Sequence, residues 1–341
     1  MKKLTILFSL LLMVFFLQPS EIMAQKVSKK KTPEVKSAVV KSTRHAQKTG
    51  KKNTKTVRNS VNPKNLGPDF QAAILMNMTD RKILYEQNAD KQIQPASLTK
   101  VLSLFLTYEA MSQGKVHWLD PVVVSQTARQ ADGSRMFIEA GETIPLEILI
   151  KGMTVISAND ASVAVAEHVG GSVEHFVEMM NRKVVELGMT RSSFRNPNGL
   201  PADGQYTTAR DMLILSDAYL RRFPGSLALH SMQYYTYKRI TQHNCNALLK
   251  KYPDVDGLKS GFVRAAGYHL IATARRGNTR LIAIVMGART PDIRVRESRR
   301  LLDAGFQILQ ENRNSASLSC PGNFRGGSID KSNTSIAMCG N

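Results

Sequence analysis

The sequence predicts an α+β domain, because strand-like segments lie at both ends of a region that is otherwise helical. The first pair of strands is a hairpin, in which residues 70–76 and 82–85 flank the turn-forming Thr79-Asp80-Arg81. The second pair joins residues 268–273 to 280–286 through a Gly-Asn turn. Strands from the two ends of the domain can share one sheet.

The region between these strands has the apolar spacing of helices. Apolar residues recur at helical spacing over 98–111, directly after Pro95, so a buried helix is expected to begin near Ser97. A last helical pattern follows the second pair of strands. The other segments with helical spacing are 146–153, 160–168, 173–187, 208–220 and 293–309.

The first 24 residues predict a secretory signal peptide. Met1-Lys2-Lys3 precedes an apolar run over residues 4–17, and Ala24 stands before the expected cleavage point. The run is shorter than the ~20 apolar residues that a membrane-spanning helix needs. Ile22 is large for its position, so an uncleaved anchor stays open as an alternative. We expect export, to the periplasm or the extracytoplasmic face of the cytoplasmic membrane.

Residues 25–65 predict a basic, disordered linker, because they have no aromatic residue and no apolar periodicity. The first 65 residues carry 15 Lys and Arg against two acids, which is +13 of the total net charge of +20. The linker could contact the membrane or an anionic wall polymer, whereas export disfavours nucleic acid. The folded domain is expected over residues 66–312 and a disordered polar tail over 313–341.

The cysteines are Cys245, Cys320 and Cys339, an odd number for an exported chain. They have neither the spacing of a metal site nor that of a disulfide framework. A disulfide between Cys320 and Cys339 stays open.

Three short motifs carry the chemistry, namely Ser97-Leu98-Thr99-Lys100, Ser157-Ala158-Asn159 and Lys259-Ser260-Gly261. A serine hydroxyl is a poor nucleophile until a base takes its proton, and helix positions three apart face the same way. Lys100 can therefore activate Ser97 if burial and the charge of Lys259 keep it neutral. The alternative for Lys100 is an exposed helix lysine.

The second and third motifs supply the remaining roles. Ser157 could relay a proton between Lys100 and the leaving amine, and Asn159 could hold the substrate amide. Lys259 and Ser260 could bind a carboxylate. Ser157 or Asn159 could also cap the following helix, and this role is compatible with catalysis.

An oxyanion requires hydrogen-bond donors as well. The backbone N–H of Ser97 and that of Phe262 would form such a pair. Gly261 permits the close approach of the backbone that this arrangement needs.

The sequence resembles the low-molecular-mass penicillin-binding proteins, the serine-type D-alanyl-D-alanine carboxypeptidases (peptidase S11-like), over residues 67–312. The match extends beyond the three motifs. The matching blocks are Pro95-Ala96-Ser97-Leu98-Thr99-Lys100, Ser157-Ala158-Asn159-Asp160-Ala161, Asn198-Gly199-Leu200, Gly204-Gln205-Tyr206-Thr207-Thr208-Ala209-Arg210-Asp211-Met212 and Val255-Asp256-Gly257-Leu258-Lys259-Ser260-Gly261.

The resemblance implies a β-lactamase/transpeptidase-like fold, with a five-stranded antiparallel sheet flanked by helices and a mostly helical subdomain. It implies removal of the terminal D-alanine from peptidoglycan pentapeptide stems through an acyl-enzyme on Ser97, and covalent inhibition by β-lactam antibiotics. It implies no metal and no organic cofactor. Arg294 falls where the family has an arginine near the substrate carboxylate, although an ordinary surface arginine is the alternative.

Two features depart from the family pattern. In Asn244-Cys245-Asn246 a cysteine stands where the family usually has arginine, so carboxylate binding or stem preference could differ. The residues after Glu311 are polar and irregular, so neither a β-rich second domain nor a C-terminal amphipathic anchor is expected.

Three other functions are alternatives to the carboxypeptidase. A DD-endopeptidase that cleaves peptidoglycan cross-links would use the same chemistry on another peptide. A class A β-lactamase is disfavoured, because its middle motif normally has Asp where this chain has Ala158. A non-catalytic binder of anionic cell-wall polymer would depend on the basic linker.

Overall fold

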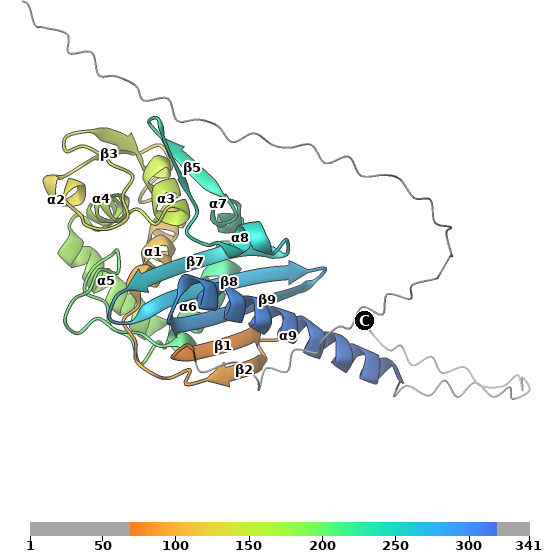
Figure 1. Cartoon of the computed structure of the whole chain (residues 1–341). Helices are drawn as coiled ribbons and strands as arrows, with labels where there is room; N and C mark the ends of the chain where they lie inside the picture. Colours follow the sequence, from red (N-terminus) through yellow and green to blue (C-terminus); the bar gives the residue numbers. More distant parts are fainter. Residues whose placement is uncertain (1–68, 319–341) are drawn as a thin grey trace, which may run out of the picture. The chain divides into compact units, whose positions relative to one another are not determined.

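The computed structural model describes residues 69–318. A five-stranded sheet in the order β2-β1-β9-β8-β7 is its centre (Figure 1), and all its strand pairs are antiparallel. This confirms the predicted α+β class. The predictions for the signal peptide, the basic linker and the Cys320–Cys339 pair lie outside the described residues.

The strands come from both ends of the domain, as predicted. β1 (Ala72–Asn77) pairs with β2 (Ile83–Gln87) in the first hairpin and with β9 (Thr279–Ala288) on its other side. β8 (Gly267–Arg276) joins β9 to β7 (Val255–Val263). Since β7 pairs with β8 alone, it is an edge strand of the sheet.

Side chains alternate between the two faces of the sheet and build two cores. Ile74 and Ile284 belong to the larger core, which contains the helix after Ser97. Leu75 and Ala283 belong to the smaller core, which contains Leu301 and other residues of the C-terminal helix. All the residues of β1 are buried, because helices cover both faces.

The helices lie on the two faces of the sheet and beyond one of its ends (Figure 1). α9 packs on β9, β8 and β1, α6 packs on β9 and β1 in the larger core, and α2–α5 with two short strands form the mostly helical part. The bounds are η2 Ala96–Thr99, α1 Lys100–Ser112, β3 Pro121–Val123, α2 Gln126–Arg129, β4 Thr143–Pro145, α3 Leu146–Val155, α4 Asn159–Gly170, α5 Val173–Glu186, α6 Ala209–Arg222, η3 Pro224–Ser226, α7 Leu227–His230, β5 Tyr234–Tyr237, β6 Ile240–His243, α8 Leu248–Lys251 and α9 Pro291–Leu318.

The last helix extends past the expected end of the domain. α9 ends at Leu318, beyond the predicted boundary at 312. Arg313 donates a hydrogen bond of 2.5 Å from Nη2 to Oγ1 of Thr279, which ties this part of the helix to the start of β9. Of the helices in residues 69–318, none has both the length and the apolar composition needed to cross a membrane.

Two buried histidines are neutral parts of the core. His269 on β8 donates from Nε2 to the carbonyl oxygen of Gln94 (3.0 Å) and accepts at Nδ1 from the N–H of Gly287 (2.8 Å). A proton on Nδ1 would face that N–H, so the partners select the neutral tautomer. Burial lowers the pKa of His269 to about 4, and burial lowers that of His230 to about 3.

We expect stability to fall as the pH drops below about 6.5, because the unfolded chain then takes up protons that the folded His269 excludes. The loss is about 3 kcal/mol for this histidine at pH 4. Urea unfolding at pH 7, 5.5 and 4 measures it. His269→Gln should flatten the pH dependence, whereas His175→Gln, on an exposed histidine of α5, should not. Equal slopes for wild type and His269→Gln would contradict this account.

Candidate active site

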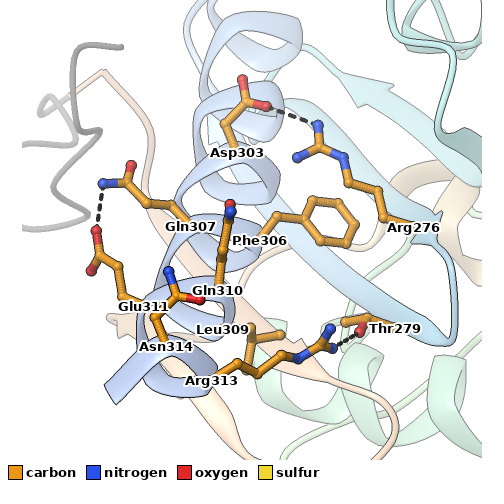
Figure 2. Close-up of a pocket in the computed structure, with 10 residues that line it drawn as sticks. All are labelled: Arg276, Thr279, Asp303, Phe306, Gln307, Leu309, Gln310, Glu311, Arg313 and Asn314. Atoms are coloured by element: carbon orange, nitrogen blue, oxygen red, sulfur yellow. Dashed lines mark hydrogen bonds and ion pairs between the residues drawn. The ribbon is translucent and has the colours of Figure 1, made fainter. Parts of the chain in front are cut away.

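The hollow beside the C-terminal helix holds no activated nucleophile. It measures about 810 Å³ and lies between α9 and the β8–β9 turn (Figure 2). No lysine, histidine or cysteine lines it. Its polar side chains bond one another: Arg276 with Asp303, Arg313 with Thr279, and Gln307 with Glu311.

A smaller groove of about 330 Å³ contains the predicted chemistry. It lies where η2, the α3–α4 junction and the edge strand β7 meet. Lys100 and Lys259 are connected to the groove through hydrogen bonds to two serines that line it. The lining includes the other predicted site residues, namely Ser97, Ser157, Asn159, Ser260, Gly261, Phe262 and Arg294.

The expected pair of nucleophile and base is formed. Lys100 Nζ lies 3.1 Å from Ser97 Oγ, and the lysine is fully buried, so the alternative of an exposed helix lysine is wrong. The helical segment begins near Ser97 as predicted: Ser97 lies in the 3₁₀ turn η2, which continues directly into the α-helix at Lys100. Residues i and i+3 eclipse in a 3₁₀ turn, which brings the two side chains together. Ala96, before the serine, has a φ of +49°.

The other partners of Lys100 are compatible with a neutral amine. Asn159 Oδ1 lies 2.6 Å and the carbonyl oxygen of Asn198 lies 2.7 Å from Nζ. Both oxygens only accept, so they take the two hydrogens of a neutral amine and leave its lone pair for the Ser97 hydroxyl. Burial, and next the charge of Lys259, hold the pKa of Lys100 well below its ordinary value.

Ser157 is hydrogen-bonded to Lys259. Its Oγ accepts a 2.9 Å hydrogen bond from Lys259 Nζ, and its φ of +62° is rare for a serine. The predicted helix cap is wrong: Ala158 is the N-cap of α4, and no side chain caps the helix. The side chain of Asn159 instead bonds Lys100 and the carbonyl oxygen of Asp132. Backbone strain at Ser157 thus coincides with the chemistry.

The groove carries positive charge without a matching carboxylate. The pKa of Lys259 is lowered to about 8, chiefly by burial, with a smaller opposing effect of Cys245 and a lowering effect of Arg294. Lys259 also donates to the carbonyl oxygen of Ser260 (3.0 Å). Within residues 69–318, no ion pair joins an acidic side chain to Lys100, Lys259 or Arg294. Such a site attracts an anion.

The edge strand approaches the nucleophile closely at Gly261. A Cβ on this residue would lie 3.1 Å from the backbone nitrogen of Ser97. The Phe262 ring is half exposed and stacks on Tyr268 with 4.3 Å between ring centroids. The oxyanion pair of Ser97 and Phe262 N–H groups stays a prediction, which this approach supports.

One loop of the groove was not anticipated. Asp160 is buried and accepts hydrogen bonds from the N–H groups of Met136 (3.1 Å) and Phe137 (2.9 Å). This carboxylate holds the loop whose Gly133 and Ser134 line the groove. Asp160 belongs to the block Ser157-Ala158-Asn159-Asp160-Ala161, but the residues of the loop itself gave no signal that the loop reaches the site.

The family model for D-alanyl-D-alanine carboxypeptidase matches residues 34–290. The chain belongs to this family. The D-alanyl-D-alanine carboxypeptidase DacF of Bacillus subtilis is 39% identical over 246 residues, which cover 71% of this chain and 63% of that protein. DacC of Escherichia coli is 39% identical over 249 residues, 71% of this chain and 62% of the relative. The chain thus spans less than two thirds of these relatives.

Solved structures of the D-alanyl-D-alanine carboxypeptidase family share the fold. Penicillin binding protein 5 from Haemophilus influenzae is 38% identical with a TM-score of 0.68, and the match covers 70% of this chain and 71% of that one. Penicillin-binding protein D2 from Listeria monocytogenes, in its ampicillin-bound form, is 32% identical with a TM-score of 0.65 over 71% of this chain and 99% of that one. The predicted β-lactamase/transpeptidase-like fold is confirmed.

Proposed function

We propose that this protein is a serine-type D-Ala-D-Ala carboxypeptidase that removes the terminal D-alanine from peptidoglycan pentapeptide stems. The observation that carries the proposal is the buried Lys100 amine 3.1 Å from Ser97 Oγ, in a groove whose cations have no acidic partner among residues 69–318. A neutral base activates the serine, and the cations bind the terminal carboxylate. Membership of the family supports the same reaction.

Acylation begins when the Ser97 oxygen attacks the carbonyl carbon of the penultimate D-alanine. Lys100 takes the hydroxyl proton, and the N–H groups of Ser97 and Phe262 stabilise the oxyanion. Lys259 and Arg294 bind the substrate carboxylate, with Arg294 able to offer a planar fork of donors.

Release of D-alanine requires a proton on its amine as the C–N bond breaks. Ser157 donates this proton and recovers the one that Lys100 took from Ser97, while the 2.9 Å hydrogen bond from Lys259 Nζ holds the Ser157 hydroxyl in place. Asn159 holds the substrate amide in line. Water, activated by Lys100, then attacks the Ser97 ester, which frees the shortened stem and restores the serine.

The location and partners follow from this substrate. Peptidoglycan stems lie outside the cytoplasm, so the N-terminal signal is proposed to direct export, to the periplasm or the outer face of the cytoplasmic membrane. β-Lactams are proposed to acylate Ser97 as mimics of the substrate. Residues 25–65 are proposed to hold the enzyme near the membrane or an anionic wall polymer.

The test is labelling with a fluorescent penicillin, followed by denaturing electrophoresis and mapping of the labelled peptide. Wild-type protein should be labelled at Ser97, and Ser97→Ala should not be labelled. Ser112→Ala, on an exposed serine at the end of α1, is the matched control and should label as wild type does. A folded wild-type protein that takes no label would favour the non-catalytic wall binder.

Product analysis separates the two peptidase reactions. Release of D-alanine from pentapeptide, measured by mass spectrometry, is the result expected for a carboxypeptidase. Cleavage of cross-linked dimers in preference to pentapeptide would identify the DD-endopeptidase instead.

We expect the rate of acylation to fall above about pH 8, because Lys259 then loses the charge that binds the carboxylate. On the acid side the rate should fall as Lys100 becomes protonated, below its depressed pKa. The second-order rate of penicillin acylation from pH 5 to 10 measures both limbs. Lys259→Arg keeps its charge and should lose the alkaline limb. An unchanged alkaline limb in this variant would rule out Lys259 as its origin.

A further inference from the structure

Cys245 places a free thiol in the groove of the nucleophile. The residue is exposed and lies between β6 and α8. Its Sγ lies 3.8 Å from the carbonyl oxygen of Ile156, the residue before Ser157. Cys245 lines the same groove as Ser97. A group attached to this sulfur would therefore occupy space that the substrate needs.

The charges around this thiol favour an anion. Burial lowers the pKa of Lys100, of Lys259 and of Arg294. A negative charge on Cys245 would raise each of these three pKa values, so the sulfur is close enough to interact with all three side chains. Lys259 and Arg294 are the cations near this sulfur, and neither has an acidic partner within residues 69–318, so the groove attracts an anionic reagent to Cys245. The thiolate is the form of cysteine that reacts with disulfides.

Arg294 independently indicates an anionic ligand. Its side chain lines the groove, and the residue is only 8% exposed. Its Nε is buried and has no hydrogen-bond partner within the described part of the chain, and the guanidinium lies 5.7 Å from the centroid of the Tyr268 ring. A buried donor without a partner is costly. The guanidinium that carries it has no acidic partner within the described residues, so a carboxylate in the groove would meet an uncompensated cation.

We propose that Cys245 is a modification site for small disulfides that carry carboxylates, and that its modification closes the groove to substrate. The Cys245 thiolate attacks one sulfur of the disulfide, whose S–S bond breaks. A mixed disulfide forms on Cys245, and the other half leaves as a thiolate. The disulfide is the oxidant, and a thiol reductant reverses the step. Arg294 binds the carboxylate of the incoming disulfide.

The first test measures the exchange itself and does not depend on the proposed function. The full chain with Cys320→Ser and Cys339→Ser leaves Cys245 as its single cysteine. Its rate of reaction with dithiobis(nitrobenzoate), a dicarboxylate, is compared with that of dithiodipyridine, which has no carboxylate. We expect folding to raise the rate ratio of these two reagents about tenfold over its value in urea-unfolded protein. Arg294→Gln should remove most of that gain.

The second test measures closure of the groove and rests on the proposed acylation of Ser97. Protein carrying the nitrobenzoate adduct, verified by intact mass, should lose labelling by fluorescent penicillin, and dithiothreitol should restore it. Addition of Cys245→Ser to the same background should leave the labelling of treated protein equal to that of its untreated sample.

Three results would overturn the proposal. They are equal rate ratios in folded and unfolded protein, full penicillin labelling of the adduct, and loss of labelling in the treated Cys245→Ser protein. If untreated protein takes no penicillin at all, the proposed function fails, while the exchange rates still decide whether Cys245 and Arg294 form a site for anionic disulfides.

Discussion

Lys100→Met is expected to lower the rate of Ser97 acylation by about 10⁴-fold, because no other amine lies within hydrogen-bond reach of the serine hydroxyl in residues 69–318. Methionine keeps the length and burial of the side chain but has no lone pair basic enough to take the proton. The measurement is the second-order rate constant for a fluorescent penicillin at pH 7. Thermal unfolding of the variant verifies that it is folded.

Lys100→Arg tests whether Lys100 acts as a base or only through its positive charge. A guanidinium does not lose its proton in proteins, so this variant keeps a cation at the site and should still be inactive. Lys151→Met is the matched control: this lysine on α3 bonds Glu147 at 2.7 Å away from the groove, and its loss should leave the rate unchanged. Substantial acylation of Lys100→Arg would show that Lys100 acts by charge and that the base is another group.

Gly199→Ala is expected to disturb the turn that holds the nucleophile. Gly199 has a φ of +85°, and an added Cβ would overlap the carbonyl oxygen of Ala96 and lie 2.9 Å from Thr99 Oγ1. Either η2 or the Asn198–Gly199 turn must move, so Ser97 and Lys100 lose their alignment. We expect destabilisation by about 3 kcal/mol and a loss of about 10²-fold in acylation rate. Urea unfolding and penicillin kinetics measure the two effects.

Gly188→Ala is the control for the backbone conformation alone. Gly188 has a φ of +73°, but an added Cβ there would meet nothing within 4 Å. The substitution should lower the free energy of unfolding by about 1–2 kcal/mol, because alanine disfavours the left-handed conformation, and it should leave the acylation rate unchanged. If the two variants lost the same stability and the same activity, the close contact with Ala96 would not be the cause.

Local patterns predicted much of the fold. The turn at Thr79-Asp80-Arg81 and the turn at Gly277 both join paired strands, and the main helices coincide with their apolar spacing. These signals act between neighbours in the chain, so they can be identified without knowledge of the rest of the fold.

The edge strand β7 was partly missed for a physical reason. No strand was predicted over residues 255–257, because Asp and Gly disfavour strands, yet β7 begins at Val255. Both carboxylate oxygens of Asp256 bond the guanidinium of Arg280 at 2.7–2.8 Å. A contact with a distant strand therefore outweighs local preference.

The hairpin of β5 and β6 was missed because its turn has no Gly or Asn. Lys238 adopts a φ of +45° there, a conformation that a lysine seldom signals. Tyr237 and Lys238 each bond Glu142, so the turn is held by a tertiary contact.

The candidate site, like the fold, was predicted only in part. The motifs identified the residue types, and the three-residue spacing predicted that Lys100 reaches Ser97. The pairing of Ser157 with Lys259 and the carbonyl oxygen of Asn198 could not be predicted, because each joins segments far apart in the chain.

Because β9 is the central strand of the sheet, the sheet can be completed only after most of the domain has been synthesised. Ile74 of β1 lies opposite Ile284 of β9, so the first strand lacks its inner neighbour until nearly the whole domain has been synthesised. Closing so long a loop is slow, because chain entropy is lost before the contacts form. The same late segment brings Gly261 of β7 against the turn of Ser97. Ser97 is thus synthesised well before the strand that forms the other side of its groove, so we expect a partly synthesised chain to take no penicillin.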